Sequence, residues 1–195
     1  MENMSLAPYY SSQSRTGMIF GHNKMIDSII HDGLWDVYSD RPMGNCAEEC
    51  VEKFNFSRES MDEFAIESFR RAQAAIGDGI FKDEIVPISL KNKKGEIIVD
   101  QDEGPFKANF EKIPLLRPAF DRNGKITAAN ASTINDGAAV VLLGGEAYRD
   151  QAEFKIRGYA SHSHDPTWFT TAPIEASKKC LKMSGLELDE IDLFE

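Results

Sequence analysis

The sequence contains few cysteines, no long apolar run and fewer basic than acidic residues. Cys46, Cys50 and Cys180 are odd in number and lack the spacing of a disulfide framework, so we expect a reducing, intracellular compartment. No segment approaches the roughly 18 consecutive apolar residues of a membrane span, which argues against a membrane partner. Lysine and arginine total 22 against 32 acidic residues. The net charge of −10 argues against a nucleic-acid partner, because phosphate contacts dominate that affinity.

The residues that are present suffice for a packed core, since 42% are hydrophobic and the length allows one or two domains. Helical spacing predicts short helices at residues 25–32 and 46–54. A longer helix is predicted to begin after Ser57 as N-cap and to run to Ile76, with an apolar face of Met61, Phe64, Ala65, Phe69, Ala72 and Ile76. Another is predicted from Pro173, which suits a first turn, to Gly185, which suits the residue after the last turn.

Strands are predicted at residues 84–90 and 95–100, joined by residues 91–94 into a hairpin. Pro87 limits the first of these strands to an edge or a bulge. Residues 154–161 are also predicted to be a strand and residues 191–194 the start of one, and residues 102–122 are predicted to be an ordered loop or a mixed region. The pattern predicts a mixed α and β fold without regular alternation.

The run TAANASTINDGAA at residues 127–139, called the signature run below, combines small residues with Asn, Asp and Ser. Small side chains allow close approach of a ligand, and Asn, Asp and Ser bond their own turns. The apolar residues 140–143 that follow are predicted to be buried, as strand or as helix. The pattern favours a ligand-facing loop anchored to the core, and an ordinary small-residue turn is the alternative.

The signature run resembles the signature segment of the thiolases, the acyl-CoA C-acyltransferases. Six further segments resemble that family in the family's order: MENMSLAPY at residues 1–9, MGNCAE at 43–48, SRESMDEFAIESFRRAQAA at 57–75, DEIVPI at 83–88, LRPAF at 116–120 and SGLELDEIDLFE at 184–195. AANAST together with TAPIEAS at 171–177 is most similar to the mitochondrial-type acetoacetyl-CoA thiolases.

The resemblance implies a five-layered α/β/α/β/α fold built from two similar halves, with a loop domain inserted in the first. Residues 1–120 would be mainly loop domain, residues 121–150 would return to the first half, and residues 151–195 would begin the second. The family's catalytic Cys, His and Asn contexts have no match here, so we expect no catalytic residue in this chain and a central piece of a longer thiolase. Unpaired sheet edges would make such a piece poorly stable alone.

Residues 105–130 contain five basic and two acidic residues, a local charge of +3 in an acidic chain. Such a window fits an anionic ligand, and a solvated surface run is the alternative. By resemblance, the nucleotide end of coenzyme A meets Lys107, Ala108, Asn109 and Lys112. Lysine stands here where the family has arginine, and asparagine where it has aspartate. Lysine keeps the positive charge of arginine but lacks its planar guanidinium group, which can donate two hydrogen bonds side by side.

The resemblance also implies that Ser132 contacts the pantetheine arm of coenzyme A. The backbone carbonyls of Ala128, Ala129 and Ala131 match a potassium ion site, and Phe69 replaces a tyrosine beside it, which puts potassium dependence in doubt. Three apolar positions match the lining of the coenzyme A tunnel, with core packing as the alternative: Leu34, Met43 and Phe120.

Other side chains have two interpretations each. Trp168 and Phe169 either reshape the acyl pocket or belong to the core. His162 and His164 would share one side of a strand and reach one metal ion, although no third ligand is identifiable. Cys46 and Cys50 are either a redox pair or small buried residues. No redox cofactor is expected.

The function implied by the resemblance is that of an acetyl-CoA C-acetyltransferase of lipid metabolism. The complete protein would condense two acetyl-CoA into acetoacetyl-CoA, or catalyse the reverse thiolysis, as a homo-oligomer (dimer or tetramer). It would be mitochondrial in a eukaryote and otherwise cytoplasmic. A non-catalytic acyl-CoA- or lipid-binding module, or an assembly module, is the alternative.

Overall fold

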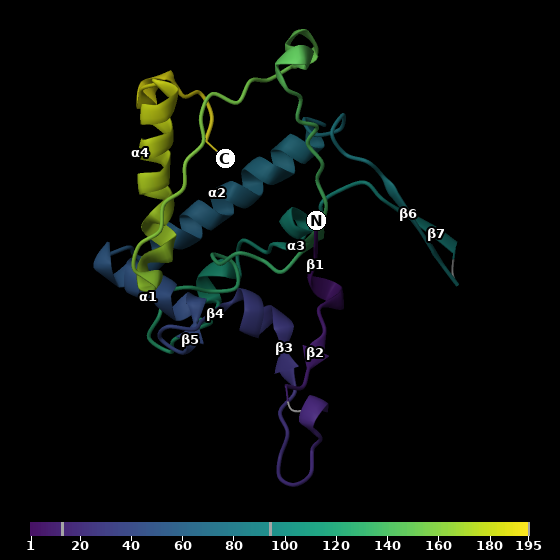
Figure 1. Ribbon diagram of the computed structural model, residues 1–195, viewed down its shortest axis with the longest axis vertical. Helices are drawn as coiled ribbons and strands as arrows, with labels where there is room; N and C mark the ends of the chain where they lie inside the picture. Colours follow the sequence, from purple (N-terminus) through teal and green to yellow (C-terminus); the bar gives the residue numbers. More distant parts are fainter. Residues whose placement is uncertain (13, 94, 195) are drawn as a thin grey trace. The chain divides into compact units, whose positions relative to one another are not determined.

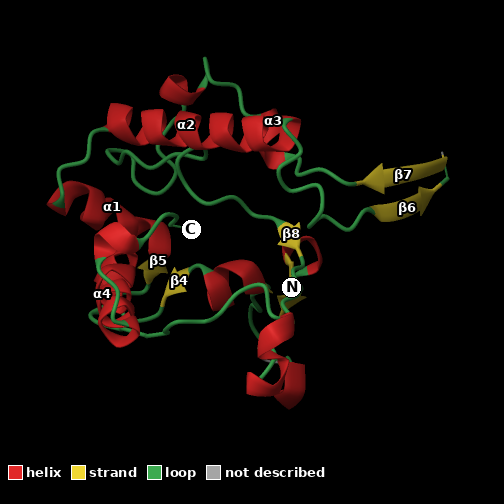
Figure 2. Ribbon diagram, turned by 90° about the horizontal axis from the view of Figure 1, so that it is seen from above, coloured by secondary structure: helices red, strands yellow, loops and turns green. Residues whose placement is uncertain are grey.

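The computed structural model describes residues 1–12, 14–93 and 95–194 (Figure 1). Lys94 of the predicted hairpin loop and Glu195 of the last motif lie outside the described residues. The chain forms two compact units, residues 1–53 with 134–195 and residues 54–133. Helices and strands are mixed in the sequence, as predicted (Figure 2).

In the first unit, helix α1 (Met43–Lys53) packs against the 3-10 helix η6 (Pro166–Thr171), which leads directly into α4 (Ala172–Ser184). The prediction for α4 is confirmed at both ends. Pro173 lies in the first turn, and Gly185 adopts φ +67°, with its N–H bonded to the Leu181 carbonyl. That left-handed conformation favours glycine. Helix α1 begins three residues earlier than predicted.

Among the described residues of the first unit, the strands form three short antiparallel pairs: β1 (Glu2–Asn3) with β8 (Asp136–Gly137), β2 (Tyr9–Tyr10) with β3 (Ile26–Asp27), and β4 (Trp35–Asp36) with β5 (Arg41–Pro42). Its other short helices are η1 (Met4–Leu6), η2 (Ser14–Thr16), the π-helix η3 (Ile29–Gly33), η5 (Glu146–Gln151) and η7 (Leu188–Glu190).

The predicted helix at residues 25–32 is wrong at its beginning. Ile26 and Asp27 pair with β2, and the helix η3 begins only at Ile29. The Asp27 carboxylate accepts a hydrogen bond from the Ile29 N–H at 2.9 Å. This local bond lets an aspartate end the strand and start the next turn.

In the second unit, α2 (Arg58–Gly77) begins where predicted, because the Ser57 hydroxyl oxygen accepts a hydrogen bond from the Ser60 N–H at 3.0 Å. Helix α3 (Gly104–Lys107) and the 3-10 helix η4 (Ile113–Leu115) pack along α2. The predicted hairpin is present as β6 (Ile88–Asn92) and β7 (Gly95–Val99). Its first strand begins after Pro87, which has no N–H for the ladder. Both views show the hairpin projecting beyond the end of α2 (Figures 1 and 2).

The apolar face predicted for α2 is wrong at Phe64, which is 79% exposed. The buried residues of this helix are Asp62 and Ala65. Phe64 lies two positions from Asp62, about 200° around the helix axis, and therefore points away from the packed side. A charged residue thus occupies the side of α2 that the apolar spacing assigned to hydrophobic side chains.

Three apolar segments that were predicted to be buried or to form strands do not do so. Residues 140–143 form no helix or strand, and Val140 is 95% exposed. Residues 154–161 and 191–194 also lack strand structure, and Phe154 is 88% exposed. A strand needs a neighbour for its backbone groups, and within the described ranges none pairs with these segments. The described residues also form no helix with the length and hydrophobicity of a membrane span.

Candidate functional site

The first part of the signature run forms a tight turn at residues 127–131. The Ala131 N–H donates to the Thr127 carbonyl at 3.0 Å, which closes the turn. The Thr127 N–H donates to the Asn130 side-chain oxygen at 2.7 Å, and the Ala129 N–H donates to the Thr127 hydroxyl oxygen at 3.3 Å. Thr127 is fully buried. These bonds fit the prediction that polar residues of the run would hydrogen-bond their own turn.

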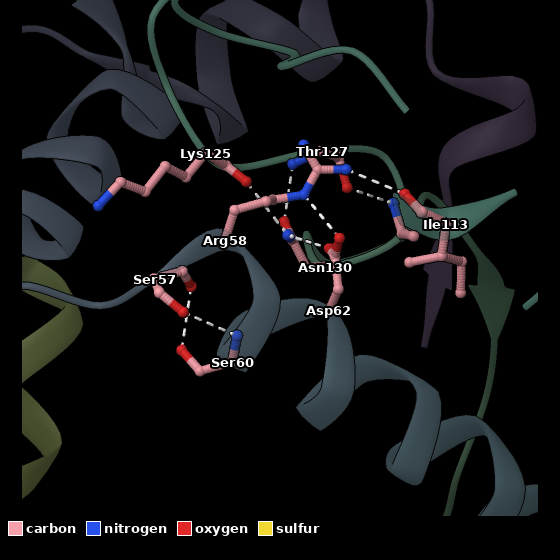
Figure 3. Close-up of polar contacts among 9 residues, drawn as sticks. Ser57, Arg58, Ser60, Asp62, Ile113, Lys125, Thr127 and Asn130 are labelled. Carbon is pink, nitrogen blue, oxygen red and sulfur yellow. Dashed lines mark hydrogen bonds and ion pairs between the residues drawn. The ribbon is translucent and has the colours of Figure 1, made fainter. Parts of the chain in front are cut away.

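A carboxylate on α2 anchors this turn. Asn130 donates from its side-chain nitrogen to Asp62 Oδ1 at 3.0 Å and to the Lys125 carbonyl at 3.2 Å (Figure 3). Asp62 is only 4% exposed. The turn is therefore fixed to the beginning of α2 by a charge-assisted hydrogen bond, which is stronger than a neutral one.

The same carboxylate reaches a third segment through Arg58. Arg58 Nε donates to Asp62 Oδ2 at 2.7 Å, and its Nη2 donates to the Ile113 carbonyl at 2.9 Å. The Arg58 side chain is 19% exposed. Figure 3 shows Arg58, Asp62, Asn130 and Ile113 converging between α2 and the two loops. One buried ion pair thus joins residues 112–115, α2 and the turn at 127–131.

The predicted nucleotide-binding residues lie at and after the end of α3. The Lys107 ammonium bonds to Glu103 at 2.5 Å and holds the pKa of that carboxyl below its ordinary value. Lys107 and Lys112 are exposed, and Ala108 is half-buried. The Asn109 side-chain oxygen accepts a hydrogen bond from the Lys112 N–H at 3.2 Å. Asn109 therefore shapes the turn that carries Lys112.

Further predicted residues of this unit lie in the signature run and on α2. Ser132 and Ala128 are exposed, and Ala129 and Ala131 are half-buried. Phe69 is half-buried on α2 and packs against Phe110, with 6.5 Å between ring centroids, which fits its core interpretation.

Phe120 is 40% exposed, and its neighbour Ala119 donates its N–H to the Ile126 carbonyl at 2.8 Å. This hydrogen bond joins the segment that contains Phe120 to the residue directly before the signature run.

Two predicted tunnel residues meet in the first unit. The Met43 N–H donates to the Leu34 carbonyl at 2.9 Å. Leu34 is 43% exposed and Met43 is half-buried. In the same unit, the Lys53 ammonium lies 3.9 Å from the centroid of the Trp168 ring, so α1 and η6 are joined by a cation–π contact.

The predicted histidine pair makes hydrogen bonds instead of gathering a ligand set. Lys179 Nζ donates to His162 Nδ1 at 3.0 Å, and His164 Nε2 donates to the Trp168 carbonyl at 2.6 Å. Among residues 1–12, 14–93 and 95–194, no three His, Cys, Asp or Glu side chains gather as a metal site.

The cysteines are free thiols. Cys46 is fully buried, and its thiol donates to Asp36 Oδ2 at 3.6 Å, as expected for a core residue. Cys50 is half-buried one helical turn further along α1.

Sequence reasoning missed Arg58 and Asp62. Their spacing of four residues inside the segment at 57–75 was a usable signal, because residues four apart share one helix face. Asp62 also lies one turn before Ile66, which is half-buried on the same side of the helix. A carboxylate in line with apolar positions of a helix indicates a paired, buried charge.

Residues 1–147 match the family described as thiolase, N-terminal domain. The chain belongs to the thiolase family. Over its whole length it is 46% identical to a mitochondrial acetyl-CoA acetyltransferase of Gibberella zeae and 47% identical to an acetyl-CoA acetyltransferase of Yarrowia lipolytica. It covers 47% and 49% of those two proteins, so the chain spans about half the length of the curated relatives it matches.

The fold is similar to solved thiolases as well. The crystal structure of a thiolase from Ascaris suum in complex with coenzyme A has a TM-score of 0.85 and 39% identity, covering 98% of this chain and 50% of that one. The thiolase-like fold implied by the motifs is therefore confirmed over the part of the fold that this chain represents.

Proposed function

We propose that the complete protein is an acetyl-CoA C-acetyltransferase, which condenses two acetyl-CoA into acetoacetyl-CoA and free coenzyme A or catalyses the reverse thiolysis. The observation that carries this proposal is the match of the entire chain, at 46–47% identity, to proteins that bear this name. The coenzyme A complex of a similar thiolase supports the same ligand class. The contribution of this chain is to bind coenzyme A rather than to supply the catalytic groups.

In this chain the nucleotide end of coenzyme A meets Lys107, Ala108, Asn109 and Lys112. The exposure of the two lysines supports this assignment, since their ammonium groups can reach phosphate oxygens from solvent. A lysine binds phosphate as a point charge and lacks the bidentate fork of arginine. Binding at this end therefore depends on charge more than on a fixed geometry.

The pantetheine arm passes the turn at residues 127–131 and contacts Ser132. An exposed hydroxyl beside a turn of small residues supports this role, because it donates or accepts hydrogen bonds and leaves room for the arm. Leu34 and Met43 of the first unit, and separately Phe120 of the second, are proposed as apolar contacts of coenzyme A, and Trp168 with Phe169 as contacts of the acyl group.

A potassium ion bound by the carbonyls of Ala128, Ala129 and Ala131 is a further part of the proposal. The three alanines belong to one tight turn, closed by the bond from the Ala131 N–H to the Thr127 carbonyl, and a hard cation prefers oxygen ligands. Phe69 supplies no oxygen and packs on Phe110. We therefore expect weak potassium dependence, which a comparison of turnover in potassium and sodium buffers measures.

The substrates proposed are acetyl-CoA and acetoacetyl-CoA, within lipid metabolism, and the complete protein is proposed to be a homo-oligomer (dimer or tetramer). Residues 1–120 act mainly as the loop domain, residues 121–150 as part of the first half, and residues 151–195 as the start of the second. The mitochondrial label of the Gibberella zeae relative supports a mitochondrial location in a eukaryote.

The deciding experiment measures turnover and binding in the full-length protein. Thiolysis of acetoacetyl-CoA is followed spectrophotometrically, and coenzyme A binding is followed by calorimetry. Turnover with binding supports the acetyltransferase. Binding without turnover supports the alternative, a non-catalytic acyl-CoA-binding module of the thiolase fold. The absence of binding contradicts both.

A further inference from the structure

We propose that the buried ion pair Arg58–Asp62 is a positioning pair. It sets the placement of the two coenzyme A-binding segments, residues 107–113 and residues 127–132, relative to each other. The inference rests on the proposed function, because it concerns how these segments bind one ligand at both of its ends. It assigns to two residues of α2 a role that requires no contact with the ligand.

Both carboxylate oxygens of Asp62 are occupied, one by Asn130 of the turn at residues 127–131 and one by Arg58 of its own helix α2. Oδ1 accepts from Asn130 at 3.0 Å and Oδ2 accepts from Arg58 at 2.7 Å. With 4% of its surface exposed, this carboxylate has little access to water, and a buried charge is stable only when paired and hydrogen-bonded. Neither partner can move away without weakening the pairing of this charge, so Asp62 holds the turn at residues 127–131 to α2 and keeps the Arg58 guanidinium in place.

Arg58 links Asp62 to the segment at residues 107–113, which is proposed to bind the nucleotide end of coenzyme A. Its Nη2 donates to the carbonyl of Ile113 at 2.9 Å, and Ile113 is 3% exposed. Lys112 directly precedes Ile113 in the chain, and its own N–H is bonded to Asn109. The guanidinium therefore fixes the carbonyl of the residue that follows Lys112, which restricts where the Lys112 side chain begins.

Asn130 links Asp62 to the segment at residues 127–132, which is proposed to contact the pantetheine arm. Its side-chain oxygen accepts from the Thr127 N–H at 2.7 Å, and its side-chain nitrogen donates to Asp62 and to the Lys125 carbonyl. Three partners leave the amide one orientation, because rotation would exchange donor and acceptor. Ser132 follows two residues later, so the direction of its hydroxyl depends on this fixed turn.

The same helix offers a matched control. Arg71 and Glu67 form a second arginine–carboxylate pair, with a 2.8 Å contact and four-residue spacing. Their side chains are 79% and 51% exposed, so this pair is solvated, and exposed pairs contribute little to stability. A conservative substitution in this pair shows the effect of altering an arginine–carboxylate pair on α2 that lies outside the two coenzyme A-binding segments.

The experiment uses the full-length protein and two substrates, acetoacetyl-CoA and acetoacetyl-pantetheine, which lacks the nucleotide. Arg58→Lys keeps a cation for Asp62 and loses the fork that also reaches Ile113. We expect the KM for acetoacetyl-CoA to rise about tenfold, since one charge-assisted hydrogen bond is lost. The KM for acetoacetyl-pantetheine and the kcat for both substrates stay within about twofold of the wild-type values, because only the nucleotide segment moves.

Asp62→Asn gives the second arm, because it loosens both segments. The KM is expected to rise about tenfold for both substrates, since the bond to Asn130 is weakened as well. Glu67→Gln leaves both KM values unchanged.

Melting temperatures separate positioning from folding. If Arg58→Lys and Asp62→Asn lower the melting temperature but leave both KM values unchanged, the pair is only structural and the proposal is overturned. An equal rise of both KM values in Arg58→Lys overturns it too. Should Asp62→Asn fail to fold, Arg58→Lys still decides the matter through its substrate difference. A wild-type protein that binds no coenzyme A refutes the proposed function, which is a separate outcome.

Discussion

The backbone N–H of Ser5 donates a 2.9 Å hydrogen bond to Oδ1 of Asp136, which lies 131 residues further along the chain. Beside it, Glu2 and Asn3 pair with Gly137 and Asp136 as β1 and β8. The first motif of the sequence and the second part of the signature run therefore hold each other within unit 1–53 with 134–195. The first part of the run is held separately, by Asp62 of α2.

This contact predicts a pH effect on the pairing of β1 and β8. Hydrogen bonds from the Ser5 side chain and N–H hold the pKa of Asp136 below its ordinary value of 3.8. A carboxyl whose pKa is lower in the folded state adds stability above its unfolded pKa, and that stability is lost as the pH falls through the folded value. The Ser5 amide resonance should titrate below pH 3.8, and Asp136→Asn should abolish this titration. A Ser5 resonance insensitive to pH would contradict the contact.

Charge reversal of the predicted nucleotide-binding lysines should weaken binding more than catalysis. Lys107→Glu and Lys112→Glu should each raise the KM for acetoacetyl-CoA roughly five- to tenfold in the full-length protein, with a smaller change in kcat. Contacts with phosphates far from the reacting carbon stabilise the ground state and the transition state alike.

Lys178→Glu is the control for this prediction. Lys178 is an exposed lysine paired with Glu175 on α4, at 2.7 Å, much as Lys107 is paired with Glu103 on α3. Its reversal should leave the KM unchanged. Equal effects from all three reversals would indicate a general charge effect, and the basic window would then be a solvated surface.

The parts of the fold that the sequence predicted well are those decided by neighbours in the chain. Ser57 starts α2, and Pro173 and Gly185 bound α4, because caps and left-handed glycines act over three or four residues. The predictions for residues 140–143 and 154–161 were wrong because hydrophobicity predicts burial but does not identify the segment that would cover these residues or pair with them. A strand forms only when another segment supplies backbone bonds.

In the candidate site, too, contacts between chain neighbours could be predicted and contacts between distant residues could not. Within the turn at residues 127–131, the bond to the Asn130 side chain followed from the prediction for asparagine, whereas the bond to the Thr127 hydroxyl was not predicted. Arg58 and Asp62 were missed because each contacts a segment more than fifty residues away, at Ile113 and Asn130. A single sequence shows the spacing of such a pair but not the buried partner that makes it matter.

The 195-residue chain expressed alone should not cleave acetoacetyl-CoA, because none of its residues matches the family's acyl-accepting cysteine context. The assay is thiolysis by purified chain, with the variant Cys46→Ser, Cys50→Ser, Cys180→Ser as its control. Turnover that disappears in this variant would show that one of these thiols is the nucleophile. Turnover that survives would show that the preparation contains another enzyme, or that a different residue acts.

Added volume at the turn should hurt coenzyme A binding more than loss of a hydroxyl. Ser132→Ala removes one hydrogen bond, which typically contributes about 0.5–1.5 kcal/mol, so the affinity should fall by roughly tenfold or less. Ala131→Leu adds a branched side chain at a half-buried position, which costs roughly 1–3 kcal/mol in a packed site and also fills space needed by the pantetheine arm. Its affinity loss should be the larger of the two.

Calorimetry with coenzyme A measures both affinities, and the melting temperature of each variant shows whether the protein is folded. Ala74→Leu is the matched control, since Ala74 is exposed on α2 in the same unit and the added volume meets solvent. It should leave binding unchanged. If Ala131→Leu folds and binds coenzyme A as tightly as Ala74→Leu does, the turn is no wall of the tunnel. The signature run would then stabilise the fold without contacting the ligand.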